Sequence, residues 1–216
     1  MIDVFRAFTT AAYVLANGAL RIIPVGDLEE AFGIKRRNPA FILMGERKGY
    51  KVEGFDYVNS PFEIQNVDFS EKTVVMTTSA GTQGIVNATG ASQILLGNFV
   101  CIKATIDFIK KAKPSIVTLV AVGHQGIEKR DEDEMCAQYI QESLRGAKPD
   151  IQKILRYLRS YKSSEKFFDK TKPEFPEGDL HCAMDIDRFN FVLKVVKKEN
   201  QLEIIRLISP ITRAES

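Results

Sequence analysis

Residues 2–10 read I-D-V-F-R-A-F-T-T, and the rest of the chain is organised around this short stretch. An apolar strand end would deliver Asp3 and Arg6, and two hydroxyls, those of Thr9 and Thr10, follow where a helix begins. In an open α/β sheet, ligands bind beyond the carboxyl ends of the strands, where backbone N–H groups point outward. Arg6 suits a permanently charged clamp for an anion, whereas Asp3 contributes nothing to anion binding unless it holds a metal ion. The stretch therefore indicates a phosphate site with Mg²⁺.

A structural interpretation of the same stretch stays open. Asp3 and Arg6 would then form an ion pair at a strand edge, and a threonine would cap the next helix. Met1 stands only two residues before Asp3, and a central parallel strand usually needs more residues. We therefore expect either a short first strand or a preceding strand that the sequence lacks.

Composition and length are those of an ordinary globular protein. The 216 residues suit a single α/β domain, 1–216, with a substantial core. With 44% hydrophobic residues, 27% charged residues and a net charge of +2, nothing favours a nucleic-acid or membrane partner. No apolar run is long enough to span a bilayer and the N-terminus has no secretion signal, so we expect a cytoplasmic protein. The cysteines lack C-x-x-C spacing and are expected to be buried, reduced thiols: Cys101, Cys136 and Cys182.

The chain alternates between segments typical of strands and segments typical of helices. Helix starts are indicated by Asp27 and Asp131, each with a glutamate three residues later. This alternation predicts an α/β fold with a mostly parallel or mixed sheet and helices on both faces. We expect strands at 20–25, 40–44, 73–76, 94–96 and 116–122, and helices at 9–17, 27–37, 99–112, 131–145 and 150–160.

Two long segments read as loops, and the end of the chain changes character. Residues 48–68 show little periodicity, and residues 163–178 are charged and contain Pro173 and Pro176. Residues 179–208 are expected to extend the sheet at its C-terminal end. The apolar edge of that extension would suit a homodimer. Its predicted strands are 179–185, 191–197 and 202–208.

Familiar phosphatase and nucleotide motifs do not fit this sequence. The D-x-D of residues 185–187 lacks the expected Thr or Val, because Phe189 occupies that place. Cys182 and Arg188 have the C-x5-R spacing of cysteine phosphatases, but the carboxylates between them would repel phosphate. No G-x-x-x-x-G-K-[ST] loop is present. We interpret His124 as a loop histidine rather than a general acid.

Polar clusters stand at several predicted strand ends, which the fold would bring to one rim of the sheet. At such a rim, Arg6 and Arg47 could neutralise a dianionic group while hydroxyls bind its oxygens. Glu46 and Arg47 also fit a local surface ion pair. The clusters comprise Asp3, Arg6, Thr9, Thr10, Glu46, Arg47, Asn59, Ser60, Thr77, Thr78, Gly81, Thr82, Glu132 and Asp133.

With these residues laid out, the chain resembles the 2-phosphosulfolactate phosphatase family, the Mg²⁺-dependent acid phosphatases of coenzyme M biosynthesis. The resemblance extends along nearly the whole sequence and rests on the order and spacing of its motifs. These are I-D-V-F-R-A-F-T-T from Ile2, A-N-G-A from Ala16, M-G-E-R-K-G from Met44, G-F-D-Y-V-N-S-P from Gly54, T-T-S-A-G-T from Thr77, G-N-F-V from Gly97, E-D-E-M-C-A from Glu132 and D-L-H-C-A from Asp179.

The resemblance implies a fold particular to this family and hydrolysis of 2-phospho-3-sulfolactate, or a related small phosphoester, to sulfolactate and phosphate. It implies Mg²⁺ bound by acidic residues among Asp3, Glu46 and Asp133. Arg6 and Arg47 would hold the anionic groups. The implied catalytic residues are Asp3, Arg6, Glu46 and Asp133, and the implied substrate-binding residues are Thr9, Thr10, Arg47, Asn59, Ser60, Thr77, Thr78, Gly81 and Thr82. The turn from Thr77 to Thr82 would form the anion cradle.

Two questions stay open at this point. Neither the residues nor the resemblance says which group activates water or whether a phosphoenzyme forms. The alternative function is a non-catalytic, small-anion-binding or regulatory protein that keeps the same rim without hydrolysis.

Overall fold

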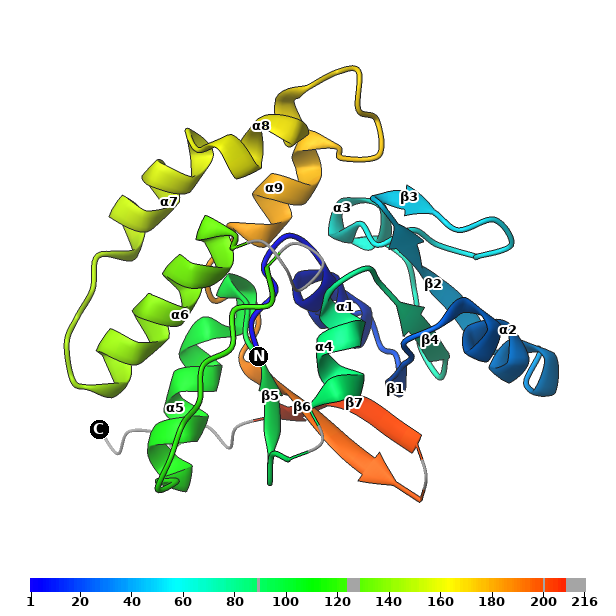
Figure 1. The fold of residues 1–216 in the computed structure, drawn as a ribbon, viewed down its shortest axis with the longest axis horizontal. Coiled ribbons are helices and arrows are strands. Elements are labelled where there is room, and N and C mark those ends of the chain that lie inside the picture. Colours follow the sequence, from blue (N-terminus) through cyan, green and yellow to red (C-terminus); the bar gives the residue numbers. More distant parts are fainter. Residues whose placement is uncertain (89, 124–128, 200, 209–216) are drawn as a thin grey trace.

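A seven-stranded mixed sheet forms the centre of the molecule (Figure 1). The computed structural model describes residues 1–88, 90–123, 129–199 and 201–208. The strand order is β3-β2-β4-β1-β7-β6-β5. Strands β2, β4 and β1 run parallel, and the other neighbours pair antiparallel, which confirms the predicted α/β class with a mixed sheet. The strands are β1 (Arg21–Pro24), β2 (Ile42–Arg47), β3 (Tyr50–Lys51), β4 (Thr73–Thr77), β5 (Ile94–Leu96), β6 (Phe191–Lys198) and β7 (Gln201–Ile208).

Helices cover both faces of the parallel strands, as predicted. Side chains alternate between the faces of a strand, so Ile22 and Val74 join the core formed with α1, whereas Ile23 and Val75 join a second core formed with α2. Helices α5, α6 and α7 lie in a row on the side away from β2 and β3 (Figure 1). The helices are α1 (Ala7–Ala16), α2 (Leu28–Arg37), α3 (Pro61–Ile64), α4 (Gly81–Asn87), α5 (Ile102–Ala112), α6 (Asp131–Leu144), α7 (Ile151–Arg159), α8 (Lys162–Phe168) and α9 (Glu177–Ala183), with a 3₁₀ helix at Phe99–Cys101.

Helix starts follow the local sequence signals closely. The Asp27 side chain accepts a hydrogen bond from the N–H of Glu30, which confirms the predicted cap of α2. Helix α6 begins at Asp131, as predicted, but the cap interpretation of Asp131 is wrong, because Arg130 is the N-cap residue. Asp131 lies in the first turn of the helix, where its negative charge suits the helix N-terminus.

Two predictions near the C-terminus are wrong. Residues 179–185 do not form a strand but lie largely in α9, because Leu180, Ala183 and Met184 have the i, i+3, i+4 spacing of a helix face. The predicted loop 163–178 contains most of α8, and its prolines come only after that helix ends.

The predicted loop 48–68 contains β3 and α3, and α4 was not predicted at all.

The predicted strand 116–122 is also wrong. Of this segment, only Ala121 forms a β-bridge, with Ile2, which in turn bridges to Gly97 on its other side. Ile116 is 80% exposed, in spite of its β-branched side chain. A strand needs a partner backbone along its length, and Ile2 provides one residue of pairing.

The C-terminal strands extend the sheet but do not lie at its edge. Strand β7 pairs with β1 and strand β6 with β5, so the outermost strands are β3 and β5. The predicted homodimer edge would therefore be limited to the parts of β6 and β7 that β5 and β1 leave unpaired, and the homodimer itself stays a prediction.

The cysteines are free and buried, as expected: Cys101, Cys136 and Cys182. In the parts of the chain that the structure describes, none of the helices combines the length and the apolar character that a membrane crossing requires.

Candidate active site

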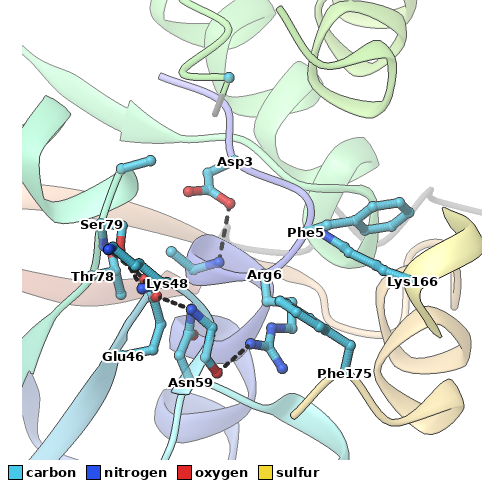
Figure 2. Close-up of a pocket in the computed structure, with 14 residues that line it drawn as sticks. Asp3, Phe5, Arg6, Glu46, Lys48, Asn59, Thr78, Ser79, Lys166 and Phe175 are labelled. Atoms are coloured by element: carbon cyan, nitrogen blue, oxygen red, sulfur yellow. Dashed lines mark hydrogen bonds between the residues drawn. The ribbon is translucent and has the colours of Figure 1, made fainter. Parts of the chain in front are cut away.

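A cavity of about 360 Å³ opens at the carboxyl ends of β2 and β4, where polar strand ends were predicted to meet (Figure 2). Five residues of the predicted site line it together: Asp3, Arg6, Glu46, Asn59 and Thr78. The other lining residues are Phe5, Ala7, Lys48, Gly49, Ser79, Ala80, Gly123, Lys166 and Phe175. These five residues, which are distant in sequence, therefore converge on one cavity.

Strand register places Glu46 in the cavity. Gly45 pairs with Thr77 in the parallel ladder, so the residues that follow them in sequence, Glu46 and Thr78, are neighbours. A Cβ on Gly45 would lie 1.9 Å from the Thr77 carbonyl oxygen, so only glycine permits this close approach. The Glu46 carboxylate accepts hydrogen bonds from the Gly49 N–H (2.7 Å), the Ser79 N–H (2.7 Å) and the Ser79 hydroxyl (3.0 Å).

Asp3 reaches the same cavity from a single-residue bridge rather than from a regular strand. Its Oδ1 accepts a hydrogen bond of 3.1 Å from the N–H of Ala7, at the start of α1. The backbone beside it is held by Asp133, which accepts from the N–H of Val4 (2.8 Å) and from the N–H of Gly123 (3.0 Å). Asp133 itself is not among the lining residues and acts as a tie between two backbone segments.

Gly81 lets α1 and α4 approach each other beside Asp3. A Cβ at this position would lie 2.7 Å from the Ala7 Cβ and 2.8 Å from Asp3 Oδ2. The predicted role of Gly81 in the site is therefore steric, because a side chain there would displace the carboxylate.

The site gathers buried negative charge. Burial, followed by the charges of Glu132 and Glu46, raises the pKa of Asp3 to about 7. Burial, followed by the charges of Asp3 and Glu132, raises the pKa of Asp133 well above its ordinary value. Burial lowers the pKa of Lys166 to about 8, although the charge of Glu132 opposes that shift. These carboxylates would be stabilised by a cation in the cavity.

Arg6 lines the cavity, but its charge is balanced by a partner within the protein. Its Nη1 lies 2.6 Å from the buried carboxylate of Asp179 and donates to the Glu174 carbonyl oxygen at 2.8 Å. Its guanidinium also lies 4.8 Å from the centroid of the Phe175 ring. The Ser60 hydroxyl donates to the same Asp179 at 2.6 Å, so Ser60 supports Arg6 rather than facing the cavity. The ion pair of the structural interpretation exists, but with Asp179 in place of Asp3.

The two threonines of the opening stretch do not line the cavity. The Thr9 hydroxyl donates to the Val4 carbonyl oxygen and the Thr10 hydroxyl to that of Arg6. Both therefore fix the start of α1.

The remaining predicted residues form hydrogen bonds at the strand ends and lie outside the cavity lining. Arg47 donates to the Thr77 hydroxyl at 2.8 Å and to the carbonyl oxygen of Glu46 at 2.8 Å. Thr82 accepts from the N–H of Thr78 at 2.8 Å, which closes the turn between β4 and α4. Arg47, Thr77 and Thr82 are absent from the cavity lining. His124 lies outside the described residues.

Sequence reasoning missed several lining residues, for different reasons. Lys48 and Ser79 stand inside motifs that were quoted, and only their neighbours were singled out. Lys166 and Phe175 come from the segment interpreted as a surface loop. A helical signal existed there, because Ser163, Ser164 and Phe167 form a buried face of α8, but nothing local indicated that this helix reaches the cavity.

A three-carboxylate metal cage is not preformed. Within the described part of the chain, no three His, Cys, Asp or Glu side chains are grouped to hold a metal ion. Both carboxylate oxygens of Glu46 and of Asp133 already accept backbone N–H groups. The buried Oδ1 of Asn59, by contrast, has no hydrogen-bond partner among the described residues, although Asn59 lines the cavity.

Comparisons with known proteins show the family to which this chain belongs. Residues 1–198 match the family model described as 2-phosphosulpholactate phosphatase. A "Probable 2-phosphosulfolactate phosphatase" of Bacillus subtilis (strain 168) is 31% identical over 212 residues, covering 96% of this chain and 90% of that protein. Proteins with the same name are 34% identical in Clostridium tetani (87% and 82% covered) and 31% identical in Thermoplasma acidophilum (89% and 83% covered). With the family model spanning almost the whole chain, this protein belongs to the 2-phosphosulpholactate phosphatase family.

Proposed function

We propose that this protein is a phosphoric monoester hydrolase that requires Mg²⁺ and acts on 2-phospho-3-sulfolactate or a related small phosphoester. The observation that carries the proposal is the single cavity in which Asp3, Glu46, Asn59 and Thr78 meet the cationic side chain of Lys166. The family assignment supports the reaction class, because the relatives are named as phosphatases. Phosphoryl transfer asks mainly for positioning and charge neutralisation, which such a cavity can supply.

The residues present fit Mg²⁺, although not through the three carboxylates first expected. Mg²⁺ takes oxygen ligands and is commonly held by one or two carboxylates, with water and substrate phosphate completing its shell. Asp3 and the unpartnered Oδ1 of Asn59 would hold it. When bound, Mg²⁺ would neutralise charge on the phosphoryl oxygens.

Protein groups would supply the rest of the anion site. The side chain of Lys48 and the turn at Thr78 and Ser79 line the wall next to Glu46. Glu46 holds that turn in place through Ser79 and Gly49 and thereby orients the wall. The site is preorganised, so little ordering remains when the substrate binds.

Phosphate release from phosphosulfolactate, measured with Mg²⁺ and with EDTA, tests the proposal. We expect EDTA to abolish turnover and Asp3→Asn to lower kcat/KM by about 10³-fold, a loss typical of removing one group that stabilises transition-state charge. Asp185→Asn is the matched control, since this carboxylate is exposed and forms an ion pair with Arg188 at the surface. Undiminished turnover in EDTA would contradict the Mg²⁺ requirement, and the absence of phosphate release from any phosphoester would contradict the reaction class.

Binding of Mg²⁺ can be measured without turnover. Titration calorimetry of the wild-type protein with MgCl₂ should show one site, and Asp3→Asn and Asn59→Ala should each weaken it. If Mg²⁺ binds equally well to both variants, Asp3 and Asn59 are not its ligands.

A further inference from the structure

The wall of the cavity opposite Glu46 is formed by one lysine and two phenylalanines. Figure 2 shows Lys166, Phe5 and Phe175 on one side, and Glu46 with its neighbours on the other. The ammonium group of Lys166 lies 4.9 Å from the ring centroid of Phe175 and 5.0 Å from that of Phe167. Phe167 in turn packs edge-on against Phe5, with 5.2 Å between ring centroids. Lys166 is therefore held in place by aromatic rings.

The charge of Lys166 is available to a ligand in a way that the charge of Arg6 is not. Arg6 faces the buried carboxylate of Asp179 at 2.6 Å, which neutralises it. Lys166 has Glu132 and Asp3 as attractive neighbours and Arg6 and Arg130 as repulsive ones. No ion pair joins Lys166 to a carboxylate of the described residues. An ammonium group that is partly buried beside apolar rings binds an anion more strongly than one at the surface.

We propose that Lys166 binds one of the two acid groups of the substrate that are not transferred, the sulfonate or the carboxylate, and so determines specificity for phosphoesters that carry a further acid group. This inference rests on the proposed function and names the substrate feature that the cavity selects. The two walls of the cavity bind different parts of the substrate. Asp3 and the turn at Thr78 and Ser79 face the phosphoryl group, and Lys166 faces the opposite end of the substrate. A monoanionic acid group suits a single lysine, whereas a dianionic phosphate beside the carboxylates Asp3 and Glu46 needs the neutralising charge that Mg²⁺ would supply.

The test compares phosphosulfolactate with p-nitrophenyl phosphate, an ester without a second acid group. In Lys166→Met, the ratio of kcat/KM for phosphosulfolactate to that for p-nitrophenyl phosphate should fall at least about 10-fold, mostly through KM, as expected for one lost charge-assisted hydrogen bond. Lys166→Arg should restore most of the ratio. Lys162→Met, which removes an exposed lysine from the same helix, is the matched control.

Two outcomes would overturn the inference. An equal loss for both substrates would place Lys166 at the phosphoryl group, and an unchanged ratio in a folded variant would show no contact with the second acid. Lys166→Gln serves as a second variant if the methionine variant unfolds.

A binding measurement separates this inference from the proposed function. Sulfolactate carries both acid groups but no phosphate, and its affinity for the wild type and for Lys166→Met can be measured by calorimetry. We expect the variant to bind it at least about 10-fold more weakly. If the wild type hydrolyses neither ester, the proposed function fails, while equal sulfolactate affinity in both proteins would refute the role of Lys166.

Discussion

Two buried carboxylates reach the cavity by different structural means. Glu46 stands at the end of β2, where a continuous parallel ladder with β4 sets its position. Asp3 follows an isolated bridge at Ile2, and its backbone is fixed by Asp133, a residue of α6. The same kind of side chain is therefore positioned by strand register on one wall and by a side-chain tie on the other.

This difference between the two walls indicates where a single substitution should disturb the site most. A strand ladder distributes its hydrogen bonds over many residues, so the loss of one leaves the others in place. On the Asp3 side, a few backbone hydrogen bonds join residues 1–3 to Gly97, Val120 and Val122. Beyond them, one carboxylate, that of Asp133, serves the N–H groups of both Val4 and Gly123. We expect changes on the Asp3 side to have the larger effects.

The largest effect is expected from Asp133→Ala. It leaves two N–H groups without acceptors, and we expect the free energy of unfolding to fall by about 3 kcal/mol, since each unsatisfied buried donor costs about 1 to 3 kcal/mol. Amide hydrogen exchange should accelerate at Val4 and Gly123 but not at Gly49 and Ser79, which Glu46 holds. Equal acceleration at all four amides would contradict the inference that Asp133 fixes only the Asp3 side of the cavity.

Glu134→Ala is the control for that experiment. Glu134 is the adjacent acidic residue of α6, and it is exposed. Its removal should change the free energy of unfolding by no more than about 0.5 kcal/mol, as for other surface substitutions.

A smaller effect is expected from Gly81→Ala. The new Cβ would meet both Ala7, in a packed helix, and Asp3, so we expect a destabilisation of about 2 kcal/mol, within the range for overpacked cores, and a loss of activity. Thermal unfolding and phosphate release would report the two effects. Gly33→Ala is the matched control, because it also lies in a helix but meets only flexible arginine tips at 3.5 and 3.7 Å. That variant should be neutral or stabilised by up to about 1 kcal/mol, and destabilisation of both variants alike would remove the steric role of Gly81.

The smallest effect is a pH dependence of stability in metal-free protein. Since the pKa of Asp3 is raised from 3.8 to about 7, the folded state binds a proton more tightly than the unfolded state. The stabilising contribution is complete below pH 3.8 and is lost as the pH rises toward 7. Between pH 6 and pH 7 in EDTA, we expect the ionisation of Asp3 to lower the free energy of unfolding by about 1 kcal/mol. Denaturant unfolding of the wild type and Asp3→Asn measures this, and a parallel pH slope in both proteins would show that Asp3 is not responsible.

Much of the site was accessible from the sequence, because it follows from local patterns. The hydroxyl-rich end of β4 and the M-G-E-R end of β2 predict polar groups at the ends of two strands. Parallel neighbouring strands place such ends side by side at one edge of the sheet. The failures have a local cause too. Residues 116–122 have the β-branched composition of a strand, yet composition cannot supply the neighbouring backbone that a strand requires.

The sequence by itself determined the alternation of strands and helices, the family, and the polar ends of β2 and β4 that carry Glu46 and Thr78. These depend on side-chain periodicity and turn chemistry, which act over a few residues. Only the tertiary structure decided that Arg6 is neutralised by Asp179, 173 positions away, and that Asp133 fixes the backbone of Val4, 129 positions away. It also placed Lys166 at the cavity. Such contacts depend on how helices pack around the finished sheet, and no local pattern encodes that packing.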